Sequence, residues 1–75
     1  MDRDWVVFTK GLLRAAMMRK GVTYKGLVER LAAIGVRETE ANLRNKISRG
    51  GFTGTFLIQC LVAMDISTLR LDDLT

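Results

Sequence analysis

The sequence predicts an all-α protein, a single domain over residues 1–75 folded as a compact bundle of four to five helices. Three observations predict this fold class. Proline is absent, 48% of the 75 residues are hydrophobic, and most apolar residues recur at every third or fourth position, which is the period of a helix. A chain of this length is near the lower size at which a domain folds on one core.

The first helix is expected over residues 4–20, and Gly21 is expected to end it. Its apolar residues form one stripe at helical spacing. Because Trp5 and Phe8 begin that stripe, we place both rings in the core.

The second helix is expected to begin at Thr23, whose hydroxyl can accept backbone N–H groups, and to end at Gly35. The fourth is expected over residues 53–64. Because it is apolar around most of its circumference, it should be the central helix, with Cys60 as a buried small hydrophobe. The inward positions of all four helices predict the core residues Leu12, Leu27, Leu31, Leu43, Ile47, Phe56, Cys60 and Leu61.

The third helix, expected over residues 39–49 with Thr39 as its cap, differs from the others. Leu43 and Ile47 are its only large apolar residues, enough to hold one narrow edge on a core. At 100° per residue, Arg44 and Lys46 fall on the two flanks of that edge. The opposite side carries small, amide-bearing and basic residues, namely Ala41, Asn42, Asn45, Ser48 and Arg49.

The composition argues against several classes of function. The chain has no histidine and one cysteine, so neither a zinc site of ordinary ligand spacing nor an internal disulfide can form. No pairing of nucleophile and base, or of two carboxylates, indicates an enzyme. No apolar run approaches the ~20 residues that cross a bilayer, and residues 1–4 lack the order of a signal peptide. We therefore expect no cofactor, metal or membrane partner, and a reducing cytoplasmic location.

Three stretches resemble Cro/C1-type repressors, the lambda-repressor-like helix-turn-helix family. Residues 21–28 are similar to the entry into that family's second helix. Arg49 and Gly50 resemble the step that closes its recognition helix, and the apolar spacing over residues 52–67 resembles its fourth helix. The resemblance implies a helix-turn-helix within the bundle. The string over residues 42–52 also resembles an uncharacterised family of short bacterial proteins.

The chain departs from the repressor pattern between the second and third helices. It holds about six extra residues between Leu31 and Gly50, near positions 33–38. They lengthen either the second helix or the turn after it, and so alter the angle at which the third helix would enter DNA. Ile47 stands where that family often has a tryptophan.

The third helix and the resemblance together predict a sequence-specific regulator of transcription, a repressor, that binds double-stranded DNA at the nucleoid. The net charge of +4 is consistent with a polyanionic partner. Asparagine can contact adenine, and arginine guanine, through paired hydrogen bonds in the major groove. Asn42, Asn45 and Arg49 lie along one line of the helix and are the predicted base contacts. The predicted phosphate contacts are Thr23, Tyr24, Lys25, Arg37, Arg44, Lys46 and Thr53.

A homodimer is expected, because one recognition helix reads too few base pairs to find its site among genomic competitors. The tail should form either one more helical turn or an extended arm. The aliphatic residues of the tail predict the dimer interface, and Trp5 is the alternative surface for pairing. The tail residues could instead fold back onto the fourth helix. The predicted interface residues are Met64, Ile66, Leu69, Leu71 and Leu74.

Two other functions remain open from the sequence. The same fold could serve as a protein-interaction module, such as an antitoxin or a factor that contacts RNA polymerase. RNA binding is the other, although only Tyr24 is expected to expose a ring on which an unpaired base could stack.

Overall fold

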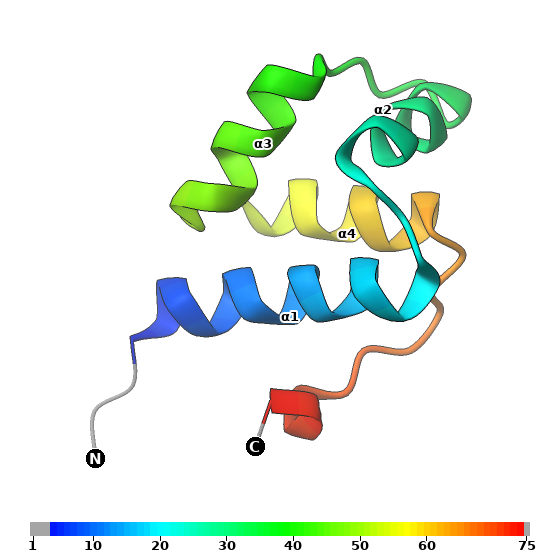
Figure 1. Cartoon of the computed structure of the whole chain (residues 1–75). Coiled ribbons are helices and arrows are strands. Elements are labelled where there is room, and N and C mark those ends of the chain that lie inside the picture. Colours follow the sequence, from blue (N-terminus) through cyan, green and yellow to red (C-terminus); the bar gives the residue numbers. More distant parts are fainter. Residues whose placement is uncertain (1–3, 75) are drawn as a thin grey trace.

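Four α-helices and a short 3-10 turn make up the described part of the chain, residues 4–74, in a computed structural model; the side chains of residues 73 and 74 lie outside that description. The elements are α1 (Trp5–Lys20), α2 (Tyr24–Ala33), α3 (Glu40–Arg49), α4 (Gly54–Ala63) and η1 (Leu71–Leu74), as drawn in Figure 1. No strand occurs among the described residues. The predicted all-α class is confirmed, and the helix boundaries agree with the prediction to within about two residues.

Each α-helix begins at a polar residue whose side chain accepts backbone hydrogen bonds. Asp4 Oδ1 accepts from the amides two and three residues ahead, at 3.1 and 3.2 Å. Thr23, Thr39 and Thr53 each accept at 3.0–3.1 Å from the amide three residues ahead. These caps satisfy donors that a helix leaves unpaired at its start. The three threonines are therefore the local cause of where α2, α3 and α4 begin.

The core lies where the four helices meet. Helix α2 packs against α3 and α4, and α1 packs against α3, α4 and η1, so α1 lies between η1 and the other helices (Figure 1). All eight predicted core residues are confirmed as buried, each at 5% exposure or less. The core also contains Leu13, Ala16, Met17, Ala63 and Met64.

Two expectations about apolar residues are wrong. Trp5 is 68% exposed and packs edge-on against the half-buried Phe8, with ring centroids 6.0 Å apart. The first turn of α1 lies beyond the point at which α4 begins (Figure 1), so Trp5 lies outside the core. Helix α4 is also not central, because Ile58 and Val62 on its outer side are 58% and 53% exposed. No helix in the described chain is long and apolar enough to cross a bilayer.

The tail after α4 folds back along the bundle. Ile66 and Leu69 are half-buried against the core, and η1 packs on α1 rather than on α4. Met64, which was predicted for a dimer interface, is fully buried because it caps α4 inside the core, so it cannot line a surface. Leu71 is 61% exposed, and the side chain of Leu74 lies outside the described residues.

The extra residues before α3 lengthen the connection and not α2. Helix α2 ends at Ala33, and Gly35, with φ of 83°, turns the chain. Val36 N then donates to Leu31 O at 2.9 Å, which ties the start of the connection back to α2. Residues 34–39 lead from there to the Thr39 cap of α3.

Candidate nucleic-acid interface

One side of α3 is exposed along the length of the helix and carries Ala41, Asn42, Asn45, Ser48 and Arg49; we call it the outward face. Leu43 and Ile47 on the opposite side are fully buried, which fixes the direction in which the outward face points. Among the described residues, the side chains of Asn42, Asn45 and Arg49 have no hydrogen-bond or ion-pair partner. Their donors and acceptors are therefore open to a ligand.

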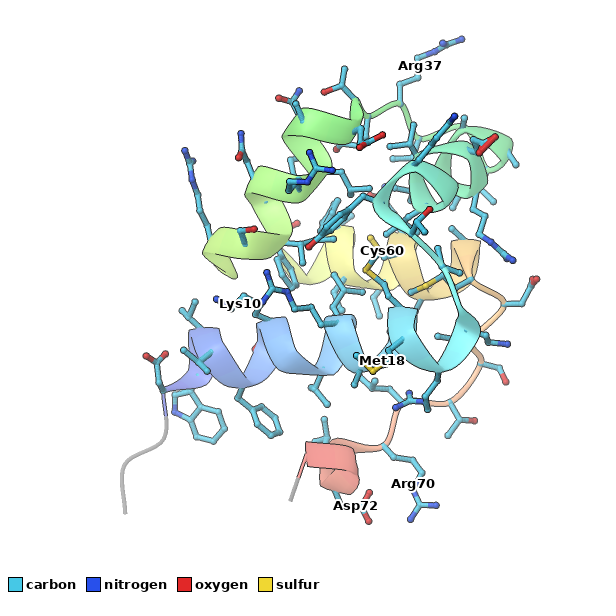
Figure 2. The ribbon with its side chains drawn as sticks, in the orientation of Figure 1. Lys10, Met18, Arg37, Cys60, Arg70 and Asp72 are labelled. Carbon is cyan, nitrogen blue, oxygen red and sulfur yellow. The ribbon has the colours of Figure 1, made fainter. Side chains whose placement is uncertain are left out.

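The C-terminal end of α3 is fixed against α1. Gly50 ends α3 with φ of 75° and is buried. A Cβ added to it would lie 2.9 Å from Val6 Cγ1 and 3.1 Å from Lys10 Cβ. Lys10 Nζ also donates to Ser48 O at 3.0 Å, which satisfies a carbonyl that the helix leaves unpaired. Lys10 therefore positions α3 (Figure 2).

Arg44 and Tyr24, two of the predicted phosphate contacts, lie together where α3 meets α2. The Arg44 guanidinium is 5.2 Å from the centre of the Tyr24 ring, a cation–π arrangement. Arg44 Nη2 also donates to Glu40 Oε2 at 2.8 Å. The arginine is thus held between a ring and a carboxylate, and that carboxylate offsets its charge.

Lys46 and Thr53 lie together on the other flank of α3, beside the start of α4. Both line one small depression beside Phe56, and Lys46 Nζ is 4.9 Å from the centre of the Phe56 ring. Lys46 also donates to Glu38. The Glu38 side chain is only 10% exposed, and an almost buried carboxylate needs a partner. Lys46 therefore stabilises the fold as well as flanking the outward face.

The remaining predicted phosphate contacts lie outside α3. The Thr23 hydroxyl caps α2, and Lys25 is exposed in the first turn of that helix. Arg37 is exposed in the connection before α3, and its side chain points away from the bundle (Figure 2). Within residues 4–74, neither Lys25 nor Arg37 is paired with an acid. These two cations are therefore available in full to an anionic ligand, whereas Arg44 and Lys46 are already paired.

Sequence reasoning missed the two acids beside α3 and the role of Lys10. Glu40 and Arg44 are four residues apart, a spacing at which opposite charges meet on a helix, so the sequence held a signal for that pair. Glu38, in the connection, and Lys46, in α3, are eight positions apart, and Lys10 and Ser48 are 38 positions apart. No local sequence pattern predicts either of these two contacts.

Cys60 lies at the centre of the core and is fully buried, as predicted for a small hydrophobe. Burial raises the pKa of its thiol to about 12; Glu38 adds to the rise and Lys46 opposes it. Because the thiolate is the reactive form of cysteine, a raised pKa keeps Cys60 as an unreactive thiol at neutral pH. In the described part of the chain, no group of three or more histidine, cysteine or acidic residues is placed to hold a metal ion.

The comparison with known families gives one match. The model of DUF6471, described as a domain of unknown function, matches residues 5–69, which span all four α-helices and stop before η1. Neither the curated proteins nor the solved structures gave a match. The likeness to an uncharacterised family is thereby confirmed, and the outward face of α3 falls inside the matched region.

Proposed function

The chain belongs to the DUF6471 family, and from the surface of α3 we propose that it is a sequence-specific double-stranded DNA-binding protein that represses transcription. The observation that carries this proposal is the outward face, an exposed side of one helix with two amides and a guanidinium that have no partner among the described residues. An ordinary solvated face would mix glutamate and lysine. This face carries neither.

The chemistry of the outward face suits the major groove. The groove admits one α-helix, and its base edges are distinguished by paired donors and acceptors. Asn42 and Asn45 each offer one donor group and one acceptor, which match adenine, and Arg49 offers the two parallel donors that match guanine. Ala41 and Ser48 are small, so they let the helix approach the base edges.

Phosphate contacts would orient α3 in the groove. Arg44 with Tyr24 lies on one flank, and Lys46 with Thr53 lies on the other, so two groups bracket the outward face. Lys25 and Arg37 add exposed cations on α2 and on the connection. Contacts of this kind fix the register of a protein on DNA without reading the sequence. In this arrangement α2, the connection and α3 would act as a helix-turn-helix.

Asn45→Ala and Arg49→Ala are expected to weaken binding to the preferred duplex by ~1–3 kcal/mol each and to relax selectivity at one base position. Binding to random duplex should change little for Asn45→Ala, because that residue contacts no phosphate. The preferred duplex is first selected from a random library, and affinities are then measured by competition with random DNA at two salt concentrations.

Arg14→Ala is the matched control for Arg49→Ala. It removes the same charge from an exposed position on α1, and it should leave base selectivity intact. If Asn42, Asn45 and Arg49 can all be replaced by alanine without a change in base preference, α3 does not read DNA and the proposal fails.

The DNA-bound form is expected to be a homodimer, since one helix of a small domain gives too little specificity against a genome. Leu71 and Trp5 are exposed on elements that neighbour each other, η1 and α1, and they are the surface candidates for pairing. Light scattering of the protein free and on a palindromic site tests this. A dimer on DNA is the expected result. A monomer both free and on DNA would rule out the homodimer.

A further inference from the structure

We propose that Glu40 sets the general affinity of the protein for DNA, acting through Arg44 to weaken binding to DNA of any sequence. This inference rests on the proposed function. It assigns a role to an exposed acidic residue of α3, the helix on which a polyanion would bind.

The geometry places Glu40 and Arg44 beside the outward face and within reach of solvent. Glu40 Oε2 lies 2.8 Å from Arg44 Nη2, and the two side chains are 44% and 53% exposed. The guanidinium also lies 5.2 Å from the centre of the Tyr24 ring. A phosphate that approached this flank would therefore meet a cation whose charge is already offset and whose position is fixed.

The ion pair between Glu40 and Arg44 affects the electrostatic part of the binding free energy. Attraction to random DNA is almost entirely electrostatic, and it grows with the number of phosphates that the cations neutralise. Base contacts by Asn42, Asn45 and Arg49 do not depend on Arg44. An acid that offsets Arg44 thus weakens binding to every sequence while leaving the discrimination between sequences in place. Binding to competing genomic sites, which is mainly electrostatic, therefore falls by the same factor as binding to the preferred site.

The second acid near α3, Glu38, does not have this role. Its side chain is 10% exposed, against 44% for Glu40, and its partner Lys46 also lies over the Phe56 ring. Removal of Glu38 would disturb the contact between the connection and α3 and would leave Lys46 without its carboxylate partner. Glu40 is on the surface, so its removal leaves the core unchanged and tests charge alone.

The test is Glu40→Gln, which keeps the shape of the side chain and removes its charge. The variant is expected to bind random duplex more tightly than the natural protein, with the slope of log K against log salt steeper by ~0.9, the value for one extra phosphate. The factor by which the variant binds random duplex more tightly than the natural protein should accordingly shrink about 3.5-fold between 50 and 200 mM salt. The ratio of affinities for the preferred and random duplexes should stay constant.

Asp65→Asn is the matched control. It removes one acidic charge and releases Arg30, 3.9 Å away, at the end of α4 that lies away from α3 (Figure 1). Asparagine also tolerates the φ of 58° at this position. The control should leave the salt slope on random DNA unchanged.

Arg44→Ala completes a double-mutant cycle. In the Glu40→Gln background it should lower the salt slope by ~0.9, and in the natural background it should lower it by clearly less. If Glu40→Gln tightens random binding no more than Asp65→Asn does, or if Arg44→Ala has the same effect in both backgrounds, Glu40 has no such role. If the natural protein selects no duplex at all, the proposed function itself fails, and this inference with it.

Discussion

Leu31→Ala is expected to lower the free energy of unfolding by ~2–5 kcal/mol, a large share of the stability of a small domain. Leu31 is fully buried in the cluster that α2 shares with the other helices. Its removal leaves a cavity at a point where the backbone has little freedom to collapse, because Leu31 O also accepts hydrogen bonds from Ile34 N and Val36 N. Chemical denaturation monitored by circular dichroism measures the loss.

Leu71→Ala is the matched control, since it makes the same chemical change at a side chain that is 61% exposed. It should cost no more than ~0.5 kcal/mol. Equal losses for the two variants would mean that the inner face of α2 is not the centre of the core.

Gly50→Ala is expected to cost ~2–4 kcal/mol, because two penalties coincide at this residue. Its φ of 75° is unfavourable for a residue with a Cβ. The added Cβ would also lie 3.0 Å from the Val6 carbonyl oxygen, which is backbone and cannot swing aside. To accept the methyl group, α1 and the end of α3 must move apart.

The neighbouring Gly51 provides the control. A Cβ at Gly51 would meet no atom within 4 Å, so Gly51→Ala should be neutral or slightly stabilising. Thermal melts of the two variants compare them directly. If both melt with the natural protein, α1 and α3 are not in close contact at Gly50.

The helices and the core could be predicted from the sequence because their causes are local. Thr23, Thr39 and Thr53 accept hydrogen bonds from amides three positions ahead, and a helical stripe states which residues face inward. These signals depend on a few residues that are close in the sequence, and they can be recognised without knowing which element the helix packs against. The outward direction of Asn45 could be predicted in the same way, because Asn45 lies on the side of α3 opposite Leu43 and Ile47.

The features that could not be predicted from the sequence depend on how far each helix overlaps its neighbours. The stripe on α1 gives the direction of Trp5 but not the point along α1 at which α4 begins, so the exposure of Trp5 was not predictable. The same holds for Ile58 on α4, whose outer side has no covering element in the described chain. The electrostatic surroundings of Lys46 were also hidden, because its carboxylate partner comes from a connection of unusual length.

A lone cysteine at the centre of the core also affects how the protein behaves in oxidising buffer. Burial raises the pKa of the Cys60 thiol to about 12, so the reactive thiolate is scarce at pH 7, and the fully buried sulfur atom lies beyond the reach of a second chain. Intermolecular disulfides can therefore form only between molecules that have opened. A covalently linked pair in an ageing preparation would report unfolding, and it should not be taken for the native association of two copies.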